Sequence, residues 1–255
     1  MRRAKKALQQ VARGLAALAV ALTALTAWTH YGRGEEAPRI GLSLSGDWYD
    51  RTELNPAATG LALSRAGANV RNLDPDDLPN LDAILDGLDG LVLVGGMEEV
   101  DSQNPRDVFE LELLRQAERR GMPVLALCRG AQLMTVGYGG RVQPLAPEQA
   151  GRHGLTVKSL AAHEVRIEAG TRLHALVGEG PFTVSSTHFQ GIADAGPRLR
   201  VAARADDGVI EAVELPGPRF VLGLQWHPEW EPLAGDRSLA PFRALVAASR
   251  IRPTK

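Results

Sequence analysis

The sequence predicts an α/β fold of three layers, in which helices cover both faces of a mostly parallel central sheet. Strand-like and helix-like patterns alternate from Arg39 onward. Gly90–Val94 and Val124–Leu127 are apolar without a break, which is typical of strands buried on both faces. Pro105–Arg120, which lies between them, has the spacing of an amphipathic helix. A chain of 255 residues with 44% hydrophobic residues can build one large core of this class.

The first half of the domain alternates regularly between strand and helix patterns, and glycine closes the first and the longest of the expected helices. The buried face of the longest helix is expected to carry Val108, Leu111, Leu114 and Ala117. The expected elements are, in order, a strand at Arg39–Leu44, a helix at Ala57–Ala68, a strand at Val70–Leu73, a helix at Leu78–Leu88, the strand at Gly90–Val94, the helix at Pro105–Arg120, the strand at Val124–Leu127 and a helix over Ala131–Val136.

The second half is richer in strand patterns, which are short and carry β-branched or aromatic residues. A final amphipathic pattern at Leu239–Ser249 predicts a closing helix. The strands expected in this half are Glu164–Glu168, Phe182–Ser185, Arg200–Ala203, Val209–Glu214 and Arg219–Leu224.

Residues 1–36 form a leader that is expected to be separate from the domain at residues 37–255. Five basic residues precede or enter an apolar run at Gly14–Trp28, and Val11–Tyr31 is long enough for an apolar helix that spans a membrane. No clean small-x-small cleavage site follows. We therefore favour an uncleaved signal anchor, which would tether the domain outside the cytoplasm. A cleaved signal peptide, followed by secretion, is the alternative.

Charge excludes one class of partner. The net charge is −1, and removing the five basic residues of the leader leaves about −6 on the rest of the chain. Such a body offers no basic face to a phosphate backbone, so nucleic-acid binding is not expected. The expected membrane contact is through the leader alone, and a homo-oligomer stays open. The single cysteine, Cys128, cannot form a disulfide within the chain.

Residues with chemical function follow three of the expected strands. Gly95 and Gly96 follow the first, Cys128 the second and His227 the third. In parallel sheets, sites form outside the carboxyl ends of the strands. Cys128 stands where a strand turns into a helix, and a helix N-terminus stabilises a thiolate. Gly130 is expected to allow the sharp turn.

His227 is the expected base for the Cys128 thiol. Glu229 lies two residues further on, and in extended chain both side chains would point the same way, which would let the carboxylate orient the imidazole. The backbone N–H groups of Arg129 and Gly96 are the expected donors to a developing oxyanion. Thiol, imidazole and carboxylate together are the parts of a cysteine hydrolase.

Several motifs then carry a family resemblance. Leu-Val-Leu-Val-Gly-Gly, Pro-Val-Leu-Ala-Leu-Cys-Arg-Gly-Ala-Gln and Gly-Leu-Gln-Trp-His-Pro-Glu-Trp resemble the class I glutamine amidotransferase superfamily, which has a flavodoxin-like fold. Four further motifs resemble its γ-glutamyl-γ-aminobutyrate hydrolase branch, and the resemblance runs from about Arg39 to Trp230. The motifs of that branch are Arg106-Asp-Val-Phe-Glu, Cys-Arg-Gly-Ala-Gln132, Val184-Ser-Ser-Thr-His-Phe-Gln190 and Asp207-Gly-Val-Ile-Glu-Ala-Val-Glu214.

The resemblance implies a Cys-His-Glu triad that cleaves γ-glutamyl amides of small molecules or peptides through a thioester, with no metal or organic cofactor. It also implies that four residues bind the glutamyl group, although Gln132 could instead pack within the helix and His188 within the core. The other histidines of the domain, His153, His163 and His174, match no motif and lack metal-ligand spacing. The four residues expected to bind substrate are Gly95, Gln132, His188 and Gln190.

Three departures from the family pattern concern the pocket. Ala126 stands where the family often has glycine, and Phe189 replaces the second residue of a usual histidine pair. Only Met97–Pro105 links Gly96 to the next helix, and this shorter loop is expected to leave a more open cleft. The departures put the choice of substrate in doubt, not the chemistry.

Two other functions remain open at this point. One is a glutaminase subunit that supplies ammonia to a partner synthase, although the chain has no acceptor domain. The other is a non-catalytic sensor or binding module on the same scaffold, although all three triad residues are present.

Overall fold

The computed structural model describes residues 34, 36–44, 54–100, 103–154, 161–230 and 236–251. Residues 1–33, which hold the expected apolar helix, lie outside this part, so the signal anchor or signal peptide stays a prediction. Within the described ranges, no helix has the length and apolar character needed to cross a membrane.

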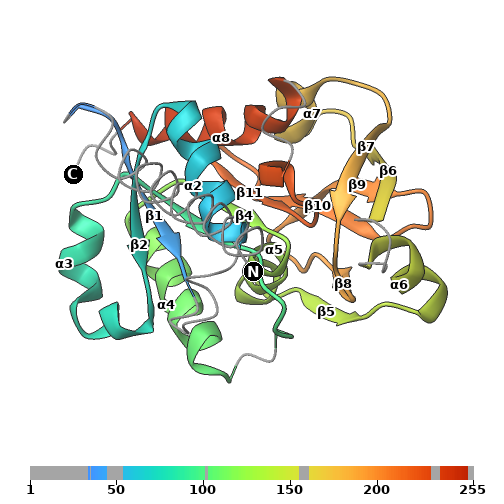
Figure 1. Ribbon diagram of the computed structural model, residues 1–255, viewed down its shortest axis with the longest axis horizontal. Coiled ribbons are helices and arrows are strands. Elements are labelled where there is room, and N and C mark those ends of the chain that lie inside the picture. The colour runs from blue at the N-terminus through green and yellow to red at the C-terminus, as the bar shows by residue number, and fades with distance from the viewer. Residues whose placement is uncertain are drawn as a thin grey trace, which may run out of the picture.

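One mixed sheet of 11 strands forms the centre of the domain (Figure 1). Its main path runs β2-β1-β3-β4-β11-β10-β9-β6-β7, and β8 joins β10 and β5 beside that path. The strands are β1 (Arg39–Ser43), β2 (Asn69–Leu73), β3 (Gly90–Leu93), β4 (Val124–Leu127), β5 (Arg141–Pro144), β6 (Ala161–Ile167), β7 (Phe182–Ser186), β8 (Gln190–Asp194), β9 (Arg200–Ala205), β10 (Ile210–Glu214) and β11 (Val221–Leu224).

The expectation of a mostly parallel sheet is wrong. The pairings between β2, β1, β3, β4 and β11 are parallel, but every described pairing beyond β11 is antiparallel. Connection length explains the change, because a parallel pair needs a crossover of about a dozen residues or more. Only residues 206–209 link β9 to β10, and only residues 215–220 link β10 to β11.

Helices cover both faces of the sheet, as expected. On one face α2, α7 and α8 pack against a cluster that includes Leu42, Leu125 and Leu222. On the other face α3, α4 and α5 pack against Leu93, Val124 and Val221. The helices are α2 (Leu54–Ala66), α3 (Leu81–Asp86), α4 (Pro105–Arg119), α5 (Arg129–Gly137), α6 (Pro147–His153), α7 (Arg172–Val177) and α8 (Asp236–Ser249), with short 3-10 turns η1 (Pro75–Asn80) and η2 (Pro228–Trp230).

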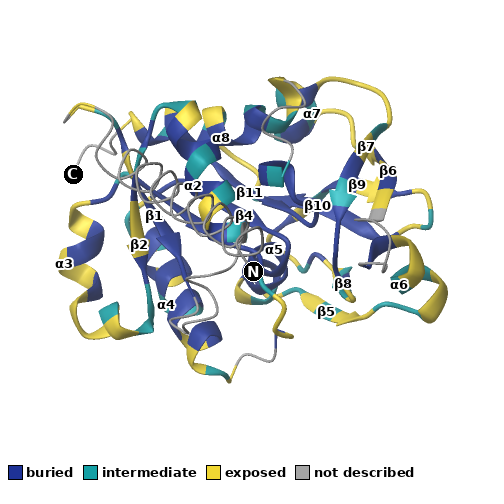
Figure 2. Cartoon of the chain, viewed as in Figure 1, coloured by how far each residue is buried: buried dark blue, intermediate teal, exposed yellow. Residues whose placement is uncertain are grey.

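Burial follows this layering, since the central strands are buried and the outer helix faces are exposed (Figure 2). Every residue of β3 and of β4 is buried, which confirms the prediction made from their unbroken apolar runs. The strands themselves carry only apolar residues, so the polar and reactive groups lie in the residues that follow them.

Two helix predictions need correction. The segment expected to be one helix at Leu78–Leu88 is instead η1 followed by α3. The Asp74 side chain accepts a hydrogen bond from Asp76 N at 3.0 Å, and Asp77 in turn accepts from Asp74 N at 3.1 Å, so the first turn starts earlier. Pro79 inside η1 cannot donate a backbone hydrogen bond, which favours a short turn here over a continuous helix.

The buried face of α4 differs in part from the expected one. Leu114 and Ala117 are buried as expected, but Val108 is 47% exposed, and Phe109 and Leu113 are fully buried. Asp107 and Glu110 share the buried face with them. The apolar periodicity alone misplaced this face because charged side chains on the helix bind buried arginines, as described below.

Candidate active site

The carboxyl ends of three neighbouring strands bring the predicted residues together. β4 lies between β3 and β11, and all three are parallel. Leu93 pairs with Ala126, and Leu127 pairs with Leu224, so the residues that follow each strand emerge at the same edge. This placement confirms that the segments that carry Gly95, Cys128 and His227 meet in space.

Cys128 occupies a strained turn between β4 and α5. Its φ of 48° and ψ of −110° make it the one described residue other than glycine with a positive φ. The Cys128 N–H donates to Leu224 O at 2.7 Å, which fixes the turn against β11. Gly130 has a different function from the expected one. A side chain at Gly130 would collide with the backbone of Leu93, so this glycine lets α5 pack closely on β3.

His227 and Glu229 form a buried pair. His227 Nδ1 lies 2.7 Å from Glu229 Oε1, and both side chains are almost fully buried. The expected extended conformation is wrong, because Pro228–Trp230 form a 3-10 turn. The turn curls Glu229 back toward the ring that precedes it, so the predicted pairing is present for a different geometric reason.

Electrostatics at His227 favour the imidazolium ion. Burial alone would lower the pKa of His227, but the charges of Cys128 and Glu229 outweigh burial and raise that pKa to about 10. Contact with Cys128 contributes to this rise as well as its charge. The raised pKa of His227 therefore favours its protonated ring, with Glu229 holding Nδ1.

The residues around the triad keep its members close together. A side-chain carbon added to Gly95 would lie 2.9 Å from His227 Cε1 and 3.5 Å from Cys128 Cβ, so only glycine leaves room here. Trp230 stacks on His227, with ring centroids 3.7 Å apart and an interplanar angle of 3°. Trp230 Nε1 donates to Asn55 Oδ1 at 2.8 Å, which ties the stack to α2.

Arg129 is the largest of the fully buried side chains, and three carboxylates compensate its charge. Its guanidinium contacts Asp107, and Nη1 lies 2.8 Å from Glu110 Oε2. Its Nε donates to Glu98 O at 3.2 Å. The guanidinium is thus engaged by these partners, and the backbone N–H of Arg129 is the group expected to meet an oxyanion.

Arg106 extends this charge cluster to the glycine pair. Its Nη2 donates to Gly95 O at 3.0 Å, and its Nε lies 3.2 Å from Glu110 Oε1. A side chain at Gly96 would run into the Arg106 guanidinium, 2.5 Å from Nη1. The buried ions therefore hold the Gly95-Gly96 segment in place from beneath.

The pocket beside Cys128 encloses about 80 Å³. Its wall includes Gln132, His188 and Gln190, together with the exposed side chains of Met97 and Phe189 at its rim. The exposed fractions are 66% for Met97 and 50% for Phe189. The exposed carboxylates Glu98 and Glu99 line the same pocket, so its rim is apolar only in part.

Three of the expected substrate-binding residues already have protein partners. Gln132 Nε2 donates to Gln190 O at 2.8 Å and to Gln225 Oε1 at 3.2 Å. His188 Nδ1 lies 2.9 Å from Gln190 O, and Gln190 Oε1 accepts from Val100 N at 3.1 Å. These contacts join the wall of the pocket to the loop that follows Gly96. Direct binding of the glutamyl group by these residues stays a prediction.

Sequence reasoning missed several residues that support the site. Asp107 and Glu110 stand out in the sequence only as part of a motif, and no pattern gives Asn55 or Trp230 a function. The sequence did hold a signal for Asp107 and Glu110. Together with Arg106 they fall on the side of a helix that faces the buried strands. Asn55 gave none, because its partner lies 175 residues away.

Comparison with known proteins gives consistent results. Residues 62–229 match the Peptidase C26 family model. The chain is 36% identical over 239 residues to Rv2859c of Mycobacterium tuberculosis, named as a glutamine amidotransferase, with 85% of this chain and 76% of that protein covered. It is 37% identical over 189 residues to the γ-glutamyl-γ-aminobutyrate hydrolase PuuD of Escherichia coli K12, with 66% and 74% covered.

Solved structures show the same fold at lower identity. A GMP synthase component from Thermoplasma acidophilum superposes with a TM-score of 0.63 at 21% identity, covering 84% of this chain and 96% of that chain. The glutaminase domain of Trypanosoma brucei CTPS gives a TM-score of 0.62 at 16% identity, covering 82% and 94%.

Proposed function

The chain belongs to the Peptidase C26 family of glutamine amidotransferase-like hydrolases, and on this basis we propose that it cleaves γ-glutamyl amide bonds with Cys128 as nucleophile. The observation that carries the proposal is the meeting of Cys128, in a strained conformation at the N-cap of α5, with a buried His227–Glu229 pair. The relative PuuD is named for hydrolysis of γ-glutamyl-γ-aminobutyrate, which supports the bond type.

Acylation follows from the charges at the site. The Cys128 thiolate attacks the γ-carbonyl carbon, and the carbonyl oxygen becomes an oxyanion. The N–H of Arg129 at the start of α5 and the N–H of Gly96 are the proposed donors to that oxygen. The His227 imidazolium gives its proton to the leaving amine as the C–N bond breaks. The products of this step are the free amine and a γ-glutamyl thioester on Cys128.

Deacylation uses the same groups in the opposite direction. The imidazole is now neutral and takes a proton from water, which attacks the thioester carbonyl. Collapse of the second oxyanion releases glutamate and restores the Cys128 thiolate beside the imidazolium. Glu229 keeps Nδ1 of His227 hydrogen-bonded throughout, so the other nitrogen always faces the reaction.

The position of the pocket suggests a division of the substrate. The acyl group would occupy the pocket beside Cys128, which is open on one side. The amine portion would then cross the rim between Met97 and Phe189. We propose that the apolar part of an extended amine packs against Met97 and Phe189, beside the carboxylates of Glu98 and Glu99.

Release of amine from γ-glutamyl amines, γ-glutamyl peptides and poly-γ-glutamate by the full-length chain tests the proposal. Loss of a triad nucleophile costs about 10⁶ in kcat, so Cys128→Ala should abolish turnover. Intact mass spectrometry of quenched reactions should find one glutamyl group on the parent and none on the variant. Equal turnover by Cys128→Ala would disprove the mechanism.

A partner-dependent glutaminase and a sensor module give different results in the same assays. Ammonia release from free glutamine that rises on adding a synthase would favour the first. Failure of glutamine-mimicking electrophiles to label Cys128 would favour the sensor module.

We also propose that the leader places the domain outside the cytoplasm. The basic residues that precede its apolar run should keep the start of the chain in the cytoplasm. A reporter that is active only outside the cytoplasm, fused after Lys255, should therefore be active. If this reporter is inactive, and a second reporter that is active only in the cytoplasm is active in the same fusion, the domain lies in the cytoplasm instead.

A further inference from the structure

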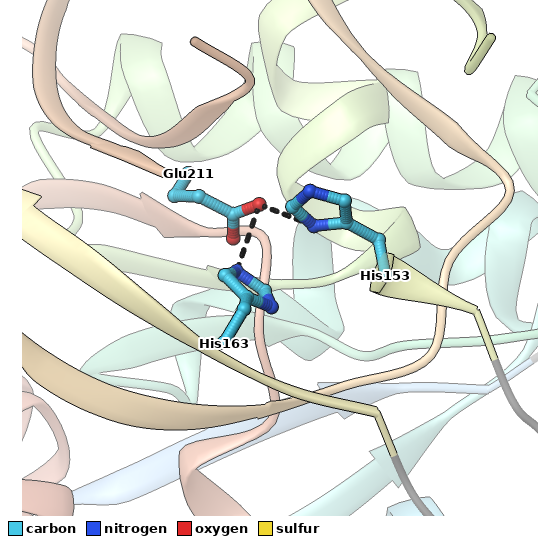
Figure 3. Close-up of side chains that lie close together, drawn as sticks. All are labelled: His153, His163 and Glu211. Carbon is cyan, nitrogen blue, oxygen red and sulfur yellow. Dashed lines mark ion pairs between the residues drawn. The ribbon is translucent and has the colours of Figure 1, made fainter. Parts of the chain in front are cut away.

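Three titratable side chains that the proposed reaction does not use meet inside the antiparallel half of the sheet. His153 ends α6, His163 lies on β6 and Glu211 lies on β10, and both imidazoles face the same carboxylate (Figure 3). All three side chains are buried. His153 Nδ1 lies 3.1 Å from Glu211 Oε1, and His163 Nε2 lies 3.3 Å from the same oxygen.

A fourth side chain completes the group, since His188 Nε2 lies 3.5 Å from Glu211 Oε1. Three ring nitrogens thus surround one carboxylate oxygen. None of these close approaches has the alignment of a hydrogen bond, and both Glu211 oxygens lack a hydrogen-bond partner. A buried polar atom without a hydrogen-bond partner costs about 1–3 kcal/mol. One ligand bound between the three ring nitrogens and Glu211 would give all of these atoms a partner.

The far nitrogens of two imidazoles show where the protons lie. His153 Nε2 is 2.9 Å from Asp207 Oδ2, and His188 Nδ1 is 2.9 Å from Gln190 O. A backbone carbonyl and an ionised carboxylate only accept hydrogen bonds, so each far nitrogen carries a proton. In the neutral ring, the nitrogen that faces Glu211 then presents a lone pair. Proteins orient the histidine ligands of metal ions in this way.

We propose that His153, His163, His188 and Glu211 hold a zinc ion. A cation at the centre would satisfy the Glu211 oxygen and the facing ring nitrogens together, and imidazole and carboxylate are regular zinc ligands. A tetrahedron with bonds of about 2.0–2.1 Å has edges of about 3.3 Å. The three nitrogen–oxygen separations, 3.1–3.5 Å, match those edges.

The donor atoms of His153, His163 and Glu211 lie within 4.8 Å of one another, so small side-chain rotations bring these three to coordination distance. His188 is not part of that group and would have to move closer to supply the fourth ligand. Sequence spacing predicts no metal site here because the ligands come from four separate segments. Asp207 on His153 and Gln190 O on His188 supply outer contacts for two of the three histidines, whereas Nδ1 of His163 has no hydrogen-bond partner among the described residues.

Four protein ligands and complete burial make this a structural site rather than a second reaction centre. Its effect reaches the pocket through His188, whose neighbours Phe189 and Gln190 form part of the wall. Gln190 O also accepts the hydrogen bond from Gln132. A bound zinc ion would therefore fix one side of the pocket.

Metal analysis of the full-length chain tests the proposal, after purification through a tag without histidines and in buffers without chelators. Mass spectrometry of the ashed protein should find one zinc per chain. His163→Gln should lose it. The matched control is His174→Gln, which changes a half-buried histidine on α7 and should keep the zinc. Cys128→Ser should also keep it, which distinguishes this site from zinc captured by the reactive thiol.

Cobalt substitution provides a second measurement if His163→Gln does not fold. The metal-free parent should take up one Co²⁺ with tetrahedral d–d absorption and no sulfur-to-cobalt charge-transfer band. If the folded parent protein retains no zinc after incubation with zinc and desalting, the proposal is overturned. The three histidines and Glu211 would then share protons and bind no metal. Zinc retained by folded His163→Gln, or lost by Cys128→Ser, would overturn the proposal equally.

Discussion

Cys128 has to face the pocket and cap α5 at the same time, and its backbone conformation is the cost of doing both. A residue with a side chain in this sparsely populated region costs about 1–3 kcal/mol. The strain is held by the 2.7 Å bond from the Cys128 N–H to Leu224 O and by the close packing of Gly130 on β3. The turn between β4 and α5 therefore lowers the stability of the fold, but it directs the Cys128 thiol toward the pocket.

Glycine at position 128 should relieve that strain. We expect Cys128→Gly to be about 1 kcal/mol more stable than Cys128→Ala, because strain relief exceeds the cost of glycine's freedom in the unfolded chain. Urea unfolding of the two inactive variants measures the difference. If the alanine variant is the more stable one, the turn is not strained.

Glu229 should control the alkaline limit of acylation. Its charge helps to raise the pKa of His227 to about 10, so the imidazolium needed to protonate the amine should persist almost to that pH. Glu229→Gln should move the alkaline limb of kcat/KM about 1–2 units lower, because loss of a nearby opposite charge lowers a histidine pKa. The exposed Glu179→Gln serves as the control and should leave the limb in place. An unchanged limb in Glu229→Gln would contradict the pairing.

Gly95 should be intolerant of even one added carbon. In Gly95→Ala the new carbon would press on His227 and move it from Cys128. We expect kcat to fall about 100-fold, as a 1 Å displacement of a catalytic group can cause. Gly60→Ala, in an open position on α2, should leave kcat unchanged and raise stability by about 0.5–1 kcal/mol. Comparable kcat values for both variants would show that Gly95 does not set the approach of the triad.

At the scale of elements, α4 joins the fold to the site. Its inner side carries Asp107 and Glu110, which neutralise Arg106 and Arg129 beneath the glycine pair. Glu110 also accepts a hydrogen bond from Ser43 Oγ at 2.6 Å, which reaches β1. A single helix thus sets the position of both proposed oxyanion donors through buried ions.

Removing one charge from this cluster should be costly. Glu110→Gln should destabilise the fold by about 3–5 kcal/mol, because it leaves two buried guanidinium groups with too little negative charge. Glu112→Gln on the outer side of the same helix should cost less than about 1 kcal/mol, since its arginine partners are exposed. Urea unfolding measures the free energy of unfolding of both variants. Equal losses in the two variants would show that the buried cluster contributes no more than the surface pair.

The sequence could predict the elements that its local patterns mark strongly. β3, β4 and the start of α4 fall where apolar runs and a proline placed them. The motif residues Cys128, His227 and Glu229 could be predicted because strand ends carry them. In the antiparallel half, local patterns predicted the strands β6, β7, β9 and β10 but not β5 and β8, whose pairing joins residues distant in sequence. On α4 the buried positions of Leu114 and Ala117 were predicted, but those of Asp107 and Glu110 were not, because charges compensated by buried arginines look like solvent-exposed residues.

At the scale of the whole molecule, one sheet joins the parallel and antiparallel halves. β11 pairs with β4 on one side and with β10 on the other. A single apolar cluster runs from Ile40 on β1 to Val165 on β6 and under α7 and α8. Neither half therefore has a core of its own.

We expect the protein to unfold in one cooperative transition. Far-UV circular dichroism reports the whole sheet, while tryptophan fluorescence reports in part the seam near Trp226 and Trp230. Their urea midpoints should coincide, as two-state unfolding requires. A fragment of residues 161–230 should fail to fold alone. Two separated midpoints would instead assign the halves separate stabilities.

The pairing of Leu127 with Leu224 also has an evolutionary consequence. Nucleophile and base are aligned by two adjacent strands, while the chain between them includes residues 187–190, which form part of the wall and rim of the pocket. That short segment can change by substitution or insertion without disturbing the alignment. Descendants of such a chain can thus acquire new substrates while inheriting an unchanged reaction.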